Sequence, residues 1–211
     1  MPTSTARAGL GRAPHLGPER RRPQVLDAAL EIALIAGIGA VTIGAVAQKI
    51  GVTRPVVYAC YTDRVRLVEE LLTREEQRLL ESVLTALHAS RDANGPEEAF
   101  VTGFSALLAT VAEHPDAWRL LLTGQPDPAL AERFRSARSV VTDAATTWIR
   151  PAMQRWWDTP DLDRKLPVLM ELFISSCEAA VRSHLDHAND WPAAELAELY
   201  GMAVCRALQG A

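Results

Sequence analysis

Residues 42–67 read TIGAVAQKIGVTRPVVYACYTDRVRL, and this stretch decides the fold. Thr42 is a candidate N-cap, because a run of apolar residues at helical spacing follows it. Gly51 can adopt the left-handed conformation that ends a helix. Thr53 is placed to cap a second short helix, which tolerates Pro55 in its first turn. Two short helices joined by a tight glycine turn predict a helix-turn-helix, whose second helix enters the major groove of duplex DNA.

Apolar residues recur with a helical period along the rest of the chain, and no segment alternates with a period of two over a useful length. Breaks that contain glycine or proline, such as Asn94-Gly95-Pro96 and His114-Pro115, separate the helical segments. The sequence therefore predicts an all-α protein of about nine helices. The expected helices are 23–36, 42–50, 54–59, a long one with Asp63 as its N-cap, one ending near 113, a short one around 118–122, 128–156, 164–187 and 191–208.

The chain divides into three regions by charge and pattern. Residues 1–19 are rich in Pro, Gly, Ala and Arg without a period, so we expect a disordered basic tail. Residues 20–68 are expected to form the helix-turn-helix DNA-binding domain, and residues 69–211 a larger helical domain. The first 68 residues hold nine Lys and Arg against four Asp and Glu, whereas the remainder holds thirteen against twenty-two. A basic end on an acidic body suits contact with DNA through one end only.

Composition narrows the class of protein further. The 211 residues are 48% hydrophobic and 23% charged, which is ordinary for a globular protein. Three widely spaced cysteines support neither a disulfide framework nor a CxxC site, and His184 and His187 make only a weak metal half-site, so no metal and no cofactor are expected. Without a run of 18 apolar residues or an apolar leader, we expect no membrane partner and a cytoplasmic location.

The stretch from Arg22 to Leu67 resembles the DNA-binding domain of TetR-family transcriptional regulators. About 46 residues match the family pattern in order and spacing; Tyr61 and Cys60 stand where the family usually has Phe and often His, and Arg64 where it often has Lys. The resemblance implies an all-α homodimer that binds DNA through residues 20–68 and uses residues 69–211 for ligand binding and dimerisation. The residues that carry the match are Arg22, Val25, Leu26, Ala28, Ala29, Gly37, Gly39, Thr42, Val46 to Thr53, Tyr58, Tyr61, Arg64 and Leu67.

Candidate DNA contacts follow from side-chain chemistry and from the family's layout. Arg54 begins the second helix of the motif, and arginine bidentate to guanine is the commonest specific base contact. By analogy with the family, Thr42, Tyr58 and Arg64 contact phosphates, although capping by Thr42 and core packing by Tyr58 remain alternatives. Lys49 either reaches a phosphate or is a solvated charge. The expected DNA-binding residues are Thr42, Lys49, Thr53, Arg54, Pro55, Val56, Tyr58 and Arg64, with thymine methyls or sugars as partners of Thr53, Pro55 and Val56.

All five tryptophans lie outside the helix-turn-helix region and could line an apolar cavity, with a filled core as the alternative reading of each aromatic residue. The candidate polar anchors for a ligand are His114, Arg119, Gln125 and Arg150. The expected ligand-binding residues are Phe100, Phe104, Leu108, Trp118, Leu122, Phe134 and Trp148.

The last two expected helices are apolar and rich in small residues, which let helices approach closely. In the TetR family the matching pair forms a four-helix bundle with a second subunit; packing within one subunit is the alternative. The expected dimer interface is Leu169, Leu172, Phe173, Ser176, Ala180, Leu196, Leu199, Tyr200, Ala203 and Ala207.

These observations predict a homodimeric, ligand-responsive DNA-binding regulator. The family prior favours a repressor that binds a palindromic operator and is released by a small, largely apolar effector. Two alternatives remain: a regulator without an effector, which a filled core would favour over a cavity above ~300 Å³, and an all-α enzyme on a borrowed fold. We expect no catalytic residues, because no nucleophile, paired-carboxylate or phosphate-loop signature is present. A redox role for Cys60 is a weaker hypothesis, since a lone cysteine usually behaves as a small hydrophobe.

Overall fold

The computed structural model describes residues 17–90, 93–122, 128–186, 188 and 190–211. Within these residues the chain forms nine α-helices, one short 3₁₀ helix and no strand, so the all-α prediction is confirmed. The elements are α1 (Pro18–Ala36), η1 (Ile38–Ala40), α2 (Ile43–Lys49), α3 (Arg54–Tyr58), α4 (Arg64–Ala89), α5 (Pro96–Glu113), α6 (Pro115–Leu122), α7 (Pro128–Trp157), α8 (Leu162–Leu185) and α9 (Ala193–Gln209).

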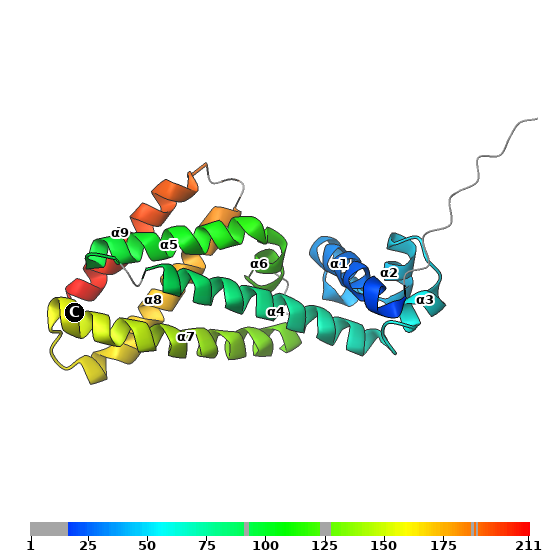
Figure 1. Ribbon diagram of the computed structural model, residues 1–211, viewed down its shortest axis with the longest axis horizontal. Coiled ribbons are helices and arrows are strands. Elements are labelled where there is room, and N and C mark those ends of the chain that lie inside the picture. The colour runs from blue at the N-terminus through cyan, green and yellow to red at the C-terminus, as the bar shows by residue number, and fades with distance from the viewer. Residues whose placement is uncertain (1–16, 91–92, 123–127, 187, 189) are drawn as a thin grey trace, which may run out of the picture.

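The molecule is elongated, with a small head and a larger body (Figure 1). The head contains α1, α2 and α3, and the body contains α5 to α9, while α4 runs from one into the other. Val25, Val46 and Val57 are fully buried in the head core, together with Leu67 and Leu71 from the first half of α4. The head is therefore packed on the same helix that forms a wall of the body.

The predicted helix ends around the motif are largely confirmed. The Thr42 Oγ1 accepts a hydrogen bond from the Ala45 backbone N–H at 3.1 Å, and the Asp63 carboxylate accepts one from Arg66 N–H at 2.9 Å. Both bonds satisfy donors that a helix leaves unpaired at its start. Gly51 has a φ of +68°, the left-handed conformation that the turn requires. Thr53 occupies the cap position of α3, but its side chain makes no capping hydrogen bond.

Helix α1 begins at Pro18, five residues before the predicted start. Proline suits the first turn of a helix because that turn's N–H groups have no partner within the helix. Glu19 also lies in this turn, where a negative charge interacts favourably with the helix dipole. The predicted tail therefore loses residues 18 and 19 to the helix, while its residues 1–16 lie outside the described part of the chain.

A buried carboxylate lies on α4 where the head meets the body. Glu75 of α4 is 0% exposed, and the Arg74 Nε donates a hydrogen bond to its Oε1 at 2.6 Å. Arg78 lies 3.4 Å from both oxygens of the same carboxylate. The Arg74 Nη1 also donates to Asp27 of α1 at 2.7 Å. This cluster ties α1 to α4 at the level where the head core ends, since Leu72 belongs to the head core and Leu79 to a core of the body.

Helices α5 and α9 make the closest approach in the body. A Cβ built on Gly201 of α9 would lie 2.7 Å from the Cα of Val101 and 2.8 Å from its N. Only a residue without a side chain therefore allows the two backbones to meet. No helix of the described residues is long and apolar enough to span a membrane.

We predict that Gly201→Ala destabilises the protein by about 1–3 kcal/mol, because the added methyl group must push α9 away from the α5 backbone. Urea unfolding of the full chain measures the effect. Gly103→Ala is the matched control: its Cβ would meet Ser90 only at an ordinary 3.7 Å, and the change to alanine favours the helix. Equal effects of the two substitutions would contradict the close α5–α9 contact.

Candidate nucleic-acid interface and ligand cavity

Helix α3 presents most of its surface to solvent. Val57 is fully buried and anchors the helix on the head core, whereas Thr53, Arg54 and Pro55 are exposed and Val56 is half-buried. All four residues at the start of the helix therefore remain accessible. A helix that is held by one apolar residue and exposes its N-terminal residues has the geometry of a recognition helix.

The Arg54 guanidinium lies across α2. A Cβ on Gly44 would be 3.2 Å from both the Nε and the Nη2 of Arg54. The missing side chain at Gly44 therefore leaves the space in which the arginine rests. No signal in the sequence identified Gly44, because the contact depends on how α2 and α3 cross.

Two predicted phosphate contacts are accessible. Tyr58 is 51% exposed, so the alternative that it packs in the core is wrong. Thr42 is exposed as well, and its hydroxyl oxygen accepts the capping bond while its proton can still be donated. Capping and phosphate contact are thus compatible at Thr42.

Arg64 and Lys49 have partners within the head that the sequence did not reveal. The Arg64 Nε donates to the Val41 carbonyl at 2.7 Å, and its Nη2 donates to the Ile38 carbonyl at 3.0 Å. Arg64 therefore holds the η1 turn that leads into α2. The Lys49 Nζ forms an ion pair with Glu31 of α1 at 2.5 Å. Contact of either side chain with phosphate stays a prediction.

Cys60 and Tyr61 belong to the head core. Tyr61 is 6% exposed, and the Arg22 guanidinium lies 5.6 Å from the centre of its ring. Tyr61 is therefore a packing residue rather than an accessible DNA contact. Burial raises the pKa of the Cys60 thiol despite the nearby Arg22, and the Sγ lies within 3.6 Å of the Pro18 and Val56 carbonyls. A buried thiol that stays protonated is a poor redox sensor.

The body contains a partly open apolar cavity of about 100 Å³ between α4, α5, α6, α7 and α8. Of its 22 lining residues, eighteen are apolar and four are charged or polar, namely Glu76, Ser90, Arg138 and Glu178. The cavity is smaller than the ~300 Å³ of a typical ligand site. The cavity therefore has room for a small ligand only. A larger ligand would bind only if the cavity opened.

Most of the predicted ligand residues meet at this cavity. Phe100, Phe104, Trp118, Leu122 and Trp148 line it. Leu108 does not: it is 1% exposed and packs in the adjoining core, because it lies on a neighbouring face of α5. The side chain of Phe134 lies outside the part that the structure describes.

The predicted polar anchors do not reach the cavity. Arg119 bonds to Asp116 at 3.3 Å, Arg150 pairs with Asp163, and exposed His114 is not part of the wall. Gln125 lies outside the described residues. The sequence-based prediction did not include Arg138 of α7 and Glu178 of α8, although both line the cavity. Their helical spacing from the apolar lining residues of α7 and α8 could have identified them.

The predicted interface residues separate into two groups. Leu169, Phe173, Ala180 and Leu196 are buried in the subunit's own core, so these four are removed from the candidate interface. Periodicity alone could not assign them, because an apolar helix face packs equally well within a subunit or between subunits. The residues that remain accessible are Leu172, Ser176, Leu199, Tyr200, Ala203 and Ala207.

Comparisons with known proteins agree with this geometry. The chain is 30% identical over 180 residues to the HTH-type transcriptional regulator AlkX of Mycobacterium tuberculosis, covering 84% of this chain and 82% of AlkX. The chain belongs to the TetR family of transcriptional regulators. Its function as a DNA-binding transcriptional regulator follows from this membership and from the exposed recognition helix. No family model matches the chain.

A second relative and a solved structure match the chain at lower identity. A second relative, the HTH-type transcriptional activator FasR of Mycolicibacterium smegmatis, is 28% identical over 139 residues, which are 64% of this chain and 62% of FasR. A TetR-like regulator from Rhodococcus sp. RHA1 superposes with a TM-score of 0.70 at 19% identity, covering 95% of this chain and all of the other. The likeness to this structure extends through head and body together.

We predict that Arg54→Ala weakens discrimination at one base pair by about 1–3 kcal/mol without lowering the stability of the fold, because the arginine is exposed. Gly44→Ala displaces the same guanidinium by a few tenths of an ångström and should alter preference at the same base pair. Binding to a panel of single-base variants measures both effects. If the two substitutions affect different base pairs, or none, Arg54 does not read a base.

Proposed function

We propose that the protein is a homodimeric repressor that binds a palindromic operator and is released by a small, largely apolar effector in the body. The observation that carries the proposal is that α4 and α6 each belong both to the head and to the cavity wall. Trp118 and Leu122 of α6 line the cavity, while Leu120 of the same helix packs in the head core.

The shared helices provide a route from the cavity to the DNA-reading surface. On α4, Leu71 packs in the head, and Leu79 and Val83 face the cavity. A molecule that moves the second half of α4 or the face of α6 therefore also moves a wall of the head. Such coupling needs an effector with different affinities for the DNA-bound and released conformations.

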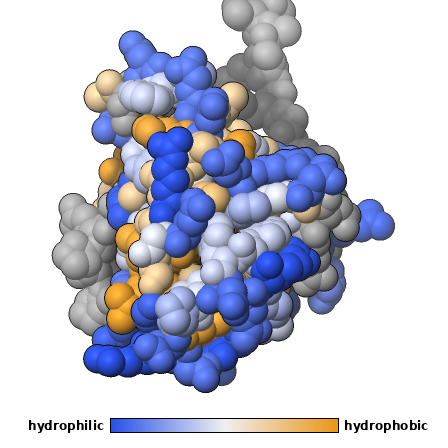
Figure 2. Space-filling view, turned by 90° about the vertical axis from the view of Figure 1, so that its left-hand side faces the viewer, coloured by the Kyte–Doolittle hydropathy of each residue, from blue (hydrophilic) through white to orange (hydrophobic). Residues whose placement is uncertain are grey.

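A second copy of the chain is the proposed partner of α8 and α9. Val168 and Leu172 on α8 are exposed by 70% and 42%, and Leu199 on α9 by 50%. Ala203 and Ala207 follow Leu199 at four-residue spacing on the same face of α9, and both are exposed. Figure 2 looks onto the end of the body where α8 begins and shows apolar patches within a mostly polar surface. Two recognition helices related by a twofold axis would fit half-sites about 34–36 Å apart, or a multiple of this distance.

The names of the two relatives differ in what they say of the direction of regulation. FasR is an activator, whereas the name of AlkX gives no sign. Repression follows from the simplest coupling, in which the unliganded protein occupies the operator. Regulation without an effector is the second candidate. The cavity volume of about 100 Å³ favours it, because a typical ligand site is larger.

Selection of bound sequences from random duplex DNA by the purified full chain tests the proposal directly. We expect enrichment of an inverted repeat, because a symmetric dimer reads two copies of the same half-site. Enrichment of single, unpaired half-sites would contradict the palindromic dimer.

We predict that Leu172→Asp combined with Leu199→Asp yields a folded monomer, because each carboxylate would otherwise be buried unpaired at the interface, at a cost of several kcal/mol. Analytical ultracentrifugation measures the mass, and affinity for the inverted repeat should fall with it. Ile35→Asp, at a position on α1 that is 82% exposed, is the control and should leave the assembly intact. A dimer that survives the double substitution would place the interface elsewhere.

A further inference from the structure

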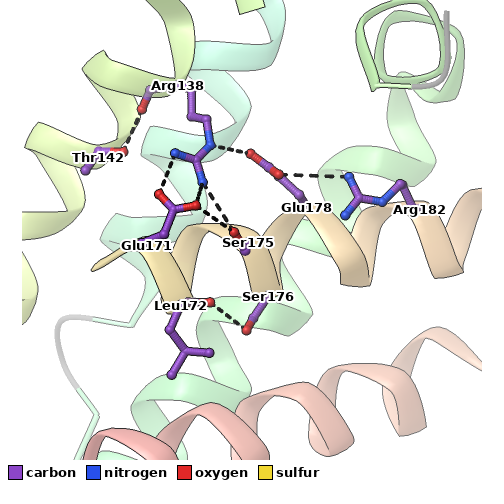
Figure 3. Close-up of polar contacts among 8 residues, drawn as sticks. All are labelled: Arg138, Thr142, Glu171, Leu172, Ser175, Ser176, Glu178 and Arg182. Carbon is purple, nitrogen blue, oxygen red and sulfur yellow. Dashed lines mark hydrogen bonds and ion pairs between the residues drawn. The ribbon is translucent and has the colours of Figure 1, made fainter. Parts of the chain in front are cut away.

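Arg138 of α7 forms a cross-helix ion network where it lines the cavity (Figure 3). Its Nη1 and Nη2 donate to the two oxygens of Glu171 at 2.9 and 2.7 Å, and its Nε donates to the Glu178 Oε1 at 2.8 Å. Its Nη2 also donates to the Ser175 Oγ at 3.3 Å. Bidentate pairing of arginine with a carboxylate is among the strongest polar contacts in proteins. The cation of the cavity wall is therefore already matched by two carboxylates.

Two carboxylates and one guanidinium make up the charged part of the described wall. Glu76 of α4 and Glu178 of α8 both line the cavity, against Arg138 as the one cation in the described wall. The remaining polar groups add no positive charge. The Ser90 hydroxyl donates to the Leu87 carbonyl at 3.1 Å, and burial raises the pKa of the Cys177 thiol to about 12, so this thiol stays neutral.

Glu178 has acceptor capacity on the side that Arg138 does not use. Its Oε2 forms a long ion pair with Arg182, whose Nη1 lies 3.9 Å away, but it accepts no hydrogen bond at that distance. A carboxylate can accept about four hydrogen bonds. A ligand that donates a hydrogen bond can therefore bind Glu178 while the contact with Arg138 stays in place.

A ligand with a carboxylate meets the opposite situation. To pair with Arg138 it must displace Glu178 or Glu171, and the displaced carboxylate then loses its partner. It would also lie beside the like charges of Glu171 and Glu178 in an apolar surrounding, where repulsion is poorly screened. We infer that the cavity selects an apolar, ring-sized molecule that ends in a hydrogen-bond donor, above all a protonated amine, and rejects the corresponding carboxylate.

The body of such a ligand follows from the size and lining of the cavity. An engineered apolar protein cavity of about 150 Å³ holds benzene, and the cavity here has about 100 Å³. Phe100, Phe104, Trp118 and Trp148 offer ring faces and edges on its walls. One aromatic ring with a two-carbon arm is larger than this space, so the helices that line the cavity must move apart to admit it with its end group at Glu178. This inference rests on the proposed function, because it names the class of the proposed effector.

Four probes with the same ring separate the contributions: phenethylamine, 2-phenylethanol, ethylbenzene and phenylacetate. Binding to the full chain without DNA is followed by tryptophan fluorescence, since Trp118 and Trp148 line the cavity, and by calorimetry. We expect phenethylamine to bind roughly tenfold more tightly than ethylbenzene, because a hydrogen bond to a charged group strengthens binding by about this factor. We expect 2-phenylethanol between them and phenylacetate weakest.

Variants assign the selectivity to the network. Glu178→Gln keeps the shape of the side chain and should bring phenethylamine to within about threefold of 2-phenylethanol, because the charged acceptor is gone. Glu113→Gln changes the same charge at an exposed site on α5 and should leave the order unchanged. Arg182→Gln removes a partly exposed cation near Glu178 and should tighten phenethylamine binding, which keeps a test available if Glu178→Gln fails to fold.

Three outcomes overturn the inference: phenylacetate binding as tightly as phenethylamine, equal affinities for all four probes, or no binding of any probe. Operator occupancy is measured separately with the inverted repeat. A probe that binds with the expected selectivity but leaves DNA bound contradicts release by an effector and leaves the selectivity of the cavity standing. Release of DNA by phenylacetate in preference to the amine would support ligand response and overturn the selectivity.

Discussion

The buried Glu75 carboxylate is the constraint on which the arrangement of head and body depends. A charge that is fully removed from water is tolerated only with close partners. Arg74 provides one partner, and its other end is held by Asp27 of α1. The cost of separating this cluster therefore opposes rotation of α1 about α4. Because α1 also packs against α2 and α6, the orientation of the reading head is fixed at this junction.

The helix that carries Glu75 has no break between the two cores. A helix of 26 residues extends about 39 Å at 1.5 Å per residue, so a small tilt at one end becomes a displacement at the other. Leu67 and Leu71 lock its first half into the head, and Leu79 and Ala86 lock its second half into the body. Helix α6 makes the same connection over a much shorter distance, through Trp118 on one side and Leu120 on the other.

Sequence reasoning succeeded where local chemistry decides the structure. The cap at Thr42, the cap at Asp63 and the left-handed Gly51 are properties of four or five neighbouring residues, and all three are confirmed. It failed where a side chain's partner lies far along the chain. Arg64 holds carbonyls more than 20 residues earlier, and Arg138 meets Glu171 and Glu178 across two helices. The sequence lists such residues but contains no record of which helix faces cross.

The small volume of the cavity has a thermodynamic consequence for the proposed response. A ligand that fits both conformations equally well cannot shift their populations, however tightly it binds. A ligand slightly larger than the present space must move α4, α6 or α7 before it fits, so its affinity differs between conformations. That difference is the free energy available to displace the head. A nearly filled core is therefore compatible with ligand response, because the misfit between ligand and cavity is what makes binding conformation-dependent.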